Sequence, residues 1–143
     1  MRLSTYSDYS IRVLMQAAVR NPARVTVDEM AGTFGISRHH LVKVVHDLGR
    51  SGYLATHRGV GGGSTLARSP EDIRLGNIVR LGEEAETVID CLDGEKHCCR
   101  LLPSCPLKGV LDEAAAAFFE VLDRYSLADL VKQPAKMRAV LGI

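Results

Sequence analysis

The fold of this 143-residue chain is decided by one stretch, Gly35-Ile36-Ser37-Arg38-His39-His40-Leu41-Val42-Lys43. Gly35 supplies a turn and Ser37 is a residue type that favours the start of a helix, so a helix is predicted from here to about Ser51. Apolar residues recur along this helix at helical spacing and predict its buried face: Leu41, Val44, Val45 and Leu48. The opposite face carries mainly polar and charged side chains, which we expect to meet solvent.

The residues before the turn predict two more helices. Residues 7–21 carry apolar side chains at helical spacing, and Asn21-Pro22 ends that helix. Thr26, followed three residues later by Glu29, is a capping box that begins a short helix through Phe34. The short helix, the turn and the helix that follows form a predicted helix-turn-helix.

The residues after this helix predict a β-hairpin. Gly52-Tyr53-Leu54 stops the helix, and strands are expected over residues 54–57 and 64–67. The tip between the strands is rich in glycine, Arg58-Gly59-Val60-Gly61-Gly62-Gly63. The order helix, helix, turn, helix, hairpin predicts a mainly α chain that begins with a winged helix-turn-helix.

The second half of the chain predicts a long helix. After a short helix over residues 75–81, periodicity is lost until Pro106, which can begin a helix that reaches about Tyr125. Its apolar positions step by four and three alternately, as in a coiled-coil contact: Leu107, Leu111, Ala114, Phe118, Val121 and Tyr125. We expect this helix to dimerise the protein; packing on the chain's own core is the alternative. Ser126 with Asp129 predicts one further capped helix.

These elements divide the chain into three expected parts. Residues 1–82 form the winged helix-turn-helix domain, residues 83–106 a cysteine-rich loop, and residues 107–143 the dimerisation helix with its tail.

The predicted motif indicates which side chains contact DNA. In a helix-turn-helix the second helix enters the major groove, and its amino-terminal residues reach the base edges. Arg38 can make a forked contact with guanine, and Lys43 can pair with a base or a phosphate. The expected DNA-contacting residues are Ser37, Arg38, His39, Lys43, Arg58, Gly62 and Gly63. The alternative is a helical hairpin with a solvated charged face and a merely flexible glycine turn.

Charge is distributed unevenly along the chain. Residues 1–80 contain 11 Lys and Arg against 6 Asp and Glu, whereas residues 81–143 contain 7 against 11. A basic half joined to an acidic half fits a nucleic-acid-binding face attached to a regulatory part. No apolar run approaches the roughly 20 residues of a membrane helix, and the first residues show no signal-peptide core, so a cytoplasmic protein is expected. We find no nucleophile–base pair, phosphate-binding loop or paired catalytic carboxylates, so we do not expect an enzyme.

All four cysteines lie within fifteen residues: Cys91, Cys98, Cys99 and Cys105. In a reducing compartment such a cluster more often binds metal than forms disulfides. Structural zinc usually uses paired cysteines separated by two to four residues, a spacing that is absent here. Three well-separated thiolates on one loop fit an iron–sulfur cluster better, because each can reach a different iron. Zinc remains an alternative, as does a redox or electron-transfer protein that uses the winged helix for protein contacts.

Nearly the whole chain resembles a known family, the iron–sulfur winged-helix regulators. Besides the helix-turn-helix stretch and the wing, the resemblance rests on four further stretches: Met1-Arg2-Leu3 with Asp8-Tyr9 and Arg12, Gly52-Tyr53-Leu54, Cys99-Arg100-Leu101-Leu102-Pro103-Ser104-Cys105-Pro106-Leu107-Lys108, and Tyr125-Ser126-Leu127-Ala128-Asp129-Leu130-Val131. The last run and Ser37-Arg38-x-His40 are similar to the NsrR-type, nitric-oxide-sensing branch.

The resemblance implies a repressor that binds a palindromic operator as a homodimer. It also implies a 4Fe-4S cluster, with 2Fe-2S still open, held by Cys91, Cys99, Cys105 and, across the dimer, Asp8. Nitric oxide would then be the signal that releases the operator. Within the same family, an iron- or redox-responsive regulator is the alternative.

Two features leave the ligand set open. Cys98 could replace Cys99 or take the place of Asp8, and His97 and Asp90 are further possible fourth ligands. Asp8 could instead serve only the helix start, through a capping box with Thr5 and an ion pair with Arg12.

Overall fold

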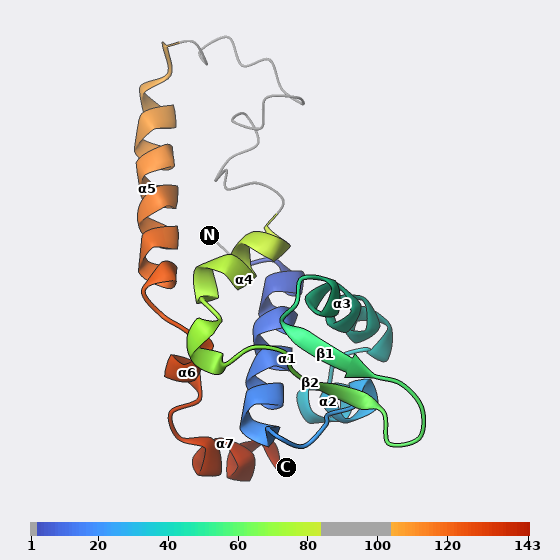
Figure 1. Ribbon diagram of the computed structural model, residues 1–143. Coiled ribbons are helices and arrows are strands. Elements are labelled where there is room, and N and C mark those ends of the chain that lie inside the picture. The colour runs from blue at the N-terminus through green and yellow to red at the C-terminus, as the bar shows by residue number, and fades with distance from the viewer. Residues whose placement is uncertain (1–2, 84–103) are drawn as a thin grey trace.

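The architecture was taken from a computed structural model, which describes residues 3–83 and 104–143. Helix α1 is the central element, with α2, α3 and the β-hairpin on one side and α4, α6 and α7 on the other (Figure 1). The elements are α1 (Thr5–Arg20), α2 (Val27–Phe34), α3 (Arg38–Arg50), β1 (Leu54–His57), β2 (Gly63–Leu66), the 3-10 turn η1 (Pro70–Asp72), α4 (Leu75–Gly82), α5 (Pro106–Asp123), α6 (Leu127–Leu130) and α7 (Pro134–Leu141). The prediction of a mainly α chain with a winged helix-turn-helix is confirmed.

The core forms around α1 because this helix is apolar on the sides that meet its neighbours. Val13, Leu14 and Ala17 are fully or almost fully buried, and they belong to one cluster with residues from α2, α3, α4 and α6. The predicted buried face of α3 is confirmed, since Leu41, Val44, Val45 and Leu48 are all buried. The fold therefore fixes which face of α3 turns outward.

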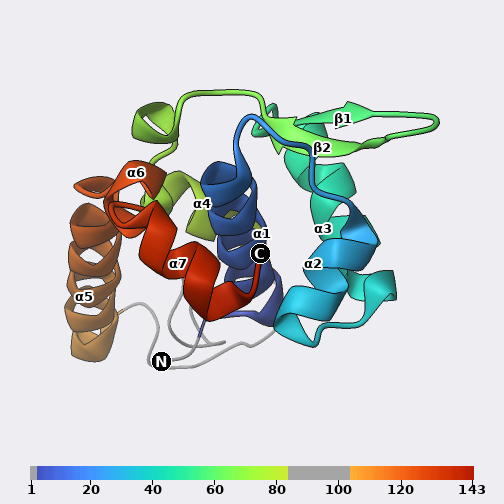
Figure 2. The ribbon, with the colours of Figure 1, turned by 90° about the horizontal axis from the view of Figure 1, so that it is seen from below.

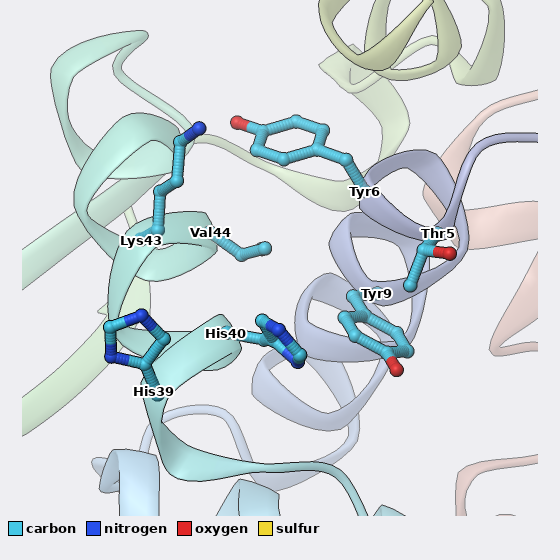
Figure 3. A pocket seen from close by; sticks show the side chains of 7 residues that line it. All are labelled: Thr5, Tyr6, Tyr9, His39, His40, Lys43 and Val44. Atoms are coloured by element: carbon cyan, nitrogen blue, oxygen red, sulfur yellow. The ribbon is translucent and has the colours of Figure 1, made fainter.

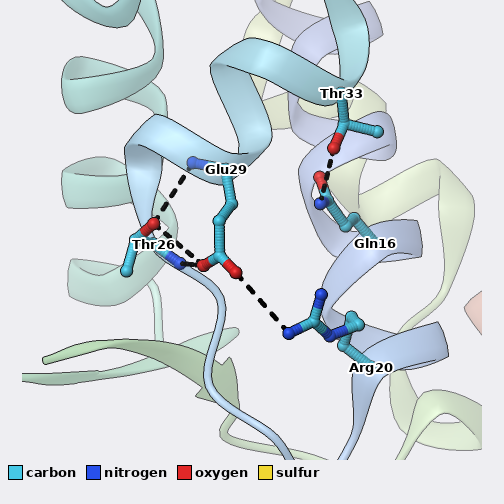
Figure 4. A network of polar contacts seen from close by, with 5 residues as sticks. All are labelled: Gln16, Arg20, Thr26, Glu29 and Thr33. Atoms are coloured by element: carbon cyan, nitrogen blue, oxygen red, sulfur yellow. Dashed lines mark hydrogen bonds and ion pairs between the residues drawn. The ribbon is translucent and has the colours of Figure 1, made fainter. Parts of the chain in front are cut away.

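The start of α2 is fixed by the predicted capping box (Figure 4). The Thr26 hydroxyl accepts from the Glu29 backbone N–H at 3.2 Å, and the Thr26 backbone N–H donates to Glu29 Oε2 at 2.7 Å. These Thr26 hydrogen bonds hold the pKa of Glu29 below its usual value, and Arg20 lies 3.5 Å from its other oxygen. Gly35 ends α2 with a φ of 63°, a backbone conformation that a residue without Cβ adopts easily. Both ends of α2 are thus set by local sequence.

Replacing Thr26 by alanine is expected to lower the free energy of unfolding by about 1 kcal/mol, because an N-terminal amide of α2 loses its acceptor. Urea unfolding followed by circular dichroism measures this. Thr5→Ala is the matched control, since Thr5 is exposed in the first turn of α1 and Ser4 caps that helix. An equal loss in both variants would contradict the capping role of Thr26.

The wing is a two-stranded antiparallel sheet in which Leu54 pairs with Leu66 and His57 with Gly63. The second strand begins one residue earlier than predicted, because Gly63 pairs with His57. The Val25 backbone adds a short bridge to Ser64, with N···O distances of 2.9 and 2.8 Å. Arg24 Nη1 also donates to the Gly61 carbonyl oxygen at 2.9 Å. The residues before α2 therefore hold the hairpin in place beside α3 (Figure 2).

Helix α5 contacts the rest of the chain mainly through α4. Phe119 is its buried side chain among the described residues, and the Arg80 guanidinium lies 4.4 Å from the Phe119 ring centroid. Arg80 also makes a two-pronged contact with Asp123, at 2.7 and 2.8 Å. Helix α6 then begins with the predicted capping box of Ser126 and Asp129. None of the helices in the described ranges is long and apolar enough to span a membrane.

Candidate DNA-reading surface and cluster ligands

The outer face of α3 carries most of the predicted DNA-contacting residues. Ser37, Arg38, His39 and Lys43 are all exposed there. Ser37 occupies the position before the first helical residue, as predicted, but its side chain makes no capping hydrogen bond. The structure therefore gathers four predicted residues on one surface, adjacent to the start of the helix.

Arg38 is held by an acidic residue that the sequence analysis missed. Its Nε donates to Asp28 Oδ1 at 2.7 Å, from α3 to the first turn of α2. The two side chains are 66% and 73% exposed, so the pair lies at the surface rather than in the core. No local sequence pattern predicts this pair, because the two residues lie ten positions apart across a turn.

A groove of about 500 Å³ separates α3 from the wing. The predicted residue Arg58 lines it together with His46 and Arg50, which were not among the predicted contacts. Gly62 and Gly63, at the end of the wing tip, have a structural reason to be glycine. A Cβ on Gly62 would lie 2.8 Å from the His57 carbonyl oxygen, and a Cβ on Gly63 would lie 3.0 Å from that of Val25. These glycines are required by the hairpin itself, and direct DNA contact by them remains a prediction.

A second hollow, of about 330 Å³, lies between α1 and α3 (Figure 3). Its walls are Thr5, Tyr6 and Tyr9 from α1 and His39, His40, Lys43 and Val44 from α3. The ring centroids of Tyr9 and His40 are 6.3 Å apart, and the Tyr6 hydroxyl lies 3.5 Å from Asp47 Oδ2. Burial and the nearby Asp47 carboxylate raise the pKa of Tyr6. The first two turns of α1 thus contact the DNA-reading helix directly.

Asp8 lies on this same part of α1. Its Oδ1 accepts from Arg12 Nε at 3.0 Å, which confirms the expected ion pair. The expected capping box with Thr5 is wrong, because Ser4 is the capping residue and its hydroxyl accepts from the Ser7 N–H. Asp8 is half-exposed and lines a hollow of about 500 Å³ with Ser4, Tyr9, Arg12 and two neighbours. Its carboxylate is therefore accessible to a ligand from outside the helix.

Hydrogen bonds tie the amino terminus of α1 to the end of α4. Glu83 Oε1 accepts from the Ser4 N–H at 2.9 Å and from the Ser7 hydroxyl at 2.7 Å. Partial burial opposes ionisation of Glu83, but the hydrogen bonds from Ser7 and Ser4 outweigh it and lower the pKa. Since residues 83–106 are the predicted cysteine-rich loop, the structure anchors the start of that loop to the helix that carries Asp8.

Of the predicted cysteine ligands, the structure describes Cys105. It is half-buried, forms no disulfide and occupies the position before the first residue of α5. Cys91, Cys98 and Cys99 lie outside the described residues. Within residues 3–83 and 104–143, no three His, Cys, Asp or Glu side chains gather closely enough to hold a metal ion. A soft thiol at the loop end and an accessible hard carboxylate on α1 are nevertheless donor types that iron accepts.

The helix-turn-helix, the wing and the largely basic outer face of α3 define a winged-helix, DNA-binding regulator of transcription. Residues 3–133 match the Rrf2 family, described as an iron-dependent transcriptional regulator. This chain belongs to the Rrf2 family.

Similar proteins agree with this assignment. The HTH-type transcriptional regulator NsrR of Bacillus subtilis (strain 168) is 43% identical over 142 residues, which cover 99% of this chain and 97% of that protein. The NsrR of Geobacillus kaustophilus is 40% identical over 99% of this chain and 95% of its own. These proteins are regulators, which confirms both the family resemblance and the expectation that the chain is not an enzyme.

Solved structures support the fold. CymR, the global cysteine regulator of B. subtilis, superposes with a TM-score of 0.73 at 25% identity, covering 92% of this chain and 97% of that one. T. potens IscR gives a TM-score of 0.73 at 27% identity, covering 92% and 87% respectively.

Proposed function

We propose that this chain is a repressor that binds a palindromic operator as a homodimer and releases it when nitric oxide reacts with a bound 4Fe-4S cluster. The observation that carries the proposal is the position of Asp8. In the sequence of α1 it lies between Tyr6 and Tyr9, and both tyrosines line the hollow against α3. A change in what Asp8 binds therefore acts within about one helical turn of contacts to the DNA-reading helix.

The proposed ligands are Cys91, Cys99 and Cys105 of one chain and Asp8 of the partner subunit, with Cys98 as an alternative to Cys99. When bound, the cluster supplies iron that can react with nitric oxide. A carboxylate is a harder and weaker ligand for such iron than a thiolate, so Asp8 would be the ligand that the iron releases most readily. A 2Fe-2S cluster on the same residues is the alternative form.

The chain's own residues provide the connection to DNA. Glu83 links the start of the proposed cluster loop to Ser4 and Ser7, and α1 then contacts α3 through Tyr6, Tyr9 and His40. A movement of the loop is thereby passed to α1, and a movement of α1 to α3. The winged helix-turn-helix domains of the two subunits must stay about 34 Å apart to reach successive turns of the major groove. A small rotation of one domain relative to the other is therefore enough to lose the operator.

The proposed dimer interface is an apolar stripe on α5. Leu107, Val110, Val121 and Tyr125 are 44–62% exposed, and Ala114 and Ala117 between them are exposed too. These six positions repeat at intervals of three and four residues along one side of the helix, as in a coiled-coil seam. Exposed apolar side chains in a continuous row are typical of an interface. The proposal keeps the predicted division into residues 1–82, 83–106 and 107–143, in which the last part forms the dimer.

The proposed DNA contacts are the predicted set, Ser37, Arg38, His39, Lys43, Arg58, Gly62 and Gly63, supplemented by His46 and Arg50. The supplement rests on the groove between α3 and the wing, where His46 and Arg50 join Arg58. A strand of the DNA backbone that passes between the two elements would meet the two arginines and His46.

The proposal is tested by adding nitric oxide stepwise to protein purified without oxygen, while visible absorption and DNA binding are both followed. A 30-base-pair duplex enriched by the protein from a random pool serves as the operator. We expect a broad iron–sulfur absorption that bleaches in step with loss of the duplex, and binding that weakens steeply with added salt. Colourless protein after anaerobic reconstitution with iron and sulfide would contradict the cluster, and bleaching without DNA release would contradict the sensing role.

A second candidate is an iron-responsive regulator with the same ligands. The family description as iron-dependent favours it. Under this function, an iron chelator releases the duplex whereas nitric oxide in the presence of excess iron does not. Repeating the titration above with an iron chelator, and with nitric oxide in the presence of excess iron, therefore separates the two signals.

A further inference from the structure

We infer that Asp28 is a specificity-determining residue that holds the Arg38 guanidinium in position to read a guanine. The inference rests on the proposed DNA-binding function and adds a residue that contacts no base itself. It starts from the 2.7 Å hydrogen bond between Arg38 Nε and Asp28 Oδ1 at the junction of α2 and α3.

The geometry of the pair decides which edge of the guanidinium is free. An arginine can fork onto guanine through Nε and one terminal nitrogen or through its two terminal nitrogens. Because Asp28 occupies Nε, the end with Nη1 and Nη2 remains available to face the groove. Arg38 is the first residue of α3, the part of a recognition helix that reaches base edges.

The exposure of the pair argues against a role in folding. Both side chains are more than half exposed, and exposed ion pairs contribute little to stability. An arginine that is already ordered loses less conformational freedom when it forks onto a base than an unrestrained one. Holding Arg38 in place before it meets DNA is therefore the larger effect available to Asp28.

The charge of Asp28 contributes a second effect. A carboxylate on a DNA-facing surface repels phosphates, and phosphate contacts bind all sequences alike. Asp28 should accordingly weaken binding to random DNA while it improves the choice of one base. Only the positioning of Arg38 raises the ratio between specific and non-specific affinity, because repulsion of phosphates acts on every duplex alike.

The test compares base preferences of the full-length protein and its variants, each used to enrich duplexes from the same random pool. Arg38→Ala should lose the preference for guanine at one position per half-site, and Asp28→Asn should weaken preference at that same position. For a duplex with that guanine replaced, we expect the discrimination by Asp28→Asn to fall on the order of tenfold. The double variant should match the base preference of Arg38→Ala, because the two residues act as one unit in reading that base.

Asp72→Asn is the matched control, since Asp72 is an exposed aspartate in η1, which packs with α6 away from α3. It should leave every base preference unchanged. If Asp28→Asn strengthens binding to all duplexes by one common factor, Asp28 acts by repulsion alone and the inference is overturned. A changed preference at a different base pair from that of Arg38→Ala overturns it as well. If the unsubstituted protein enriches no sequence at all, the proposed DNA-binding function fails too.

Discussion

Replacing Cys105 by alanine is expected to abolish the visible iron–sulfur absorption and make DNA binding insensitive to nitric oxide. Cys105 precedes Pro106 at the start of α5, and its side chain makes no capping hydrogen bond there. Loss of the thiol should therefore leave the helix intact, so a spectral change reports ligation rather than unfolding. Absorption after anaerobic reconstitution and far-ultraviolet circular dichroism measure the two effects separately.

Ser104→Ala is the control for this variant, because Ser104 is the exposed neighbour of Cys105 in the chain. It should keep the absorption and the response to nitric oxide. If Cys105→Ala also kept an unchanged absorption, Cys105 would not be a ligand. The alternative spacing through Cys98 would not rescue the proposal, since it uses Cys105 as well.

A comparison of Asp8→Ala with Arg12→Ala tests whether Asp8 binds the cluster or only pairs with Arg12. Both Asp8→Ala and Arg12→Ala remove the 3.0 Å ion pair on the surface of α1. If Asp8 also binds the cluster, Asp8→Ala alone should change the absorption spectrum, while both variants keep similar unfolding curves. Identical spectra in the two variants would leave Asp8 with its local role only.

Local sequence was sufficient for the elements that are stabilised by near neighbours. The capping boxes at Thr26 and Ser126 and the glycine turn at Gly35 involve residues at most a few positions apart, so they can be read along the chain. The buried face of α3 follows from helical periodicity in the same way. The wing could be placed to within one residue, the difference being the pairing of Gly63 with His57.

Periodicity could not separate two apolar faces on one helix. Of the predicted seam on α5, Leu111 and Phe118 are half-buried, whereas Leu107 and Val121 are exposed. The exposed row is completed by Val110 and Ala117, each one residue from a predicted position. Spacings of three and four describe both rows equally well, and only the packing of α4 beside Phe119 decides which row is left outside.

Polar contacts between residues far apart in the chain could not be predicted from the sequence either. Asp28 meets Arg38 across a turn, and Glu83 meets Ser4 from 79 residues away. Each partner has an ordinary local interpretation, as a residue in a first helical turn or at a helix end. The sequence therefore predicted most of the residues that belong to the candidate site and on which helices or strands they lie. The hydrogen bonds that join these elements could be found only from the folded structure.

The last expectation concerns the apolar stripe of α5. Val110→Glu and Val121→Glu are each expected to convert a dimer into a monomer and to weaken operator binding by about 10²- to 10⁴-fold, because the second half-site is then no longer bound intramolecularly. Both valines are well exposed in the single chain, at 62% and 44%, so a glutamate there should not unfold it. Light scattering measures the mass. For a duplex with a single half-site, the variants should show the same affinity as one winged helix-turn-helix domain of the unsubstituted protein.

Ala116→Glu introduces the same charge on the same helix, at an exposed position outside the stripe. It should leave both the mass and the operator affinity unchanged. Monomeric variants that still bound the full operator with undiminished affinity would show that the winged helix-turn-helix domains of the two subunits do not bind it together. A dimer that survived both glutamates would place the subunit contact elsewhere, and with it the geometry by which Asp8 of the partner subunit reaches the cysteine loop.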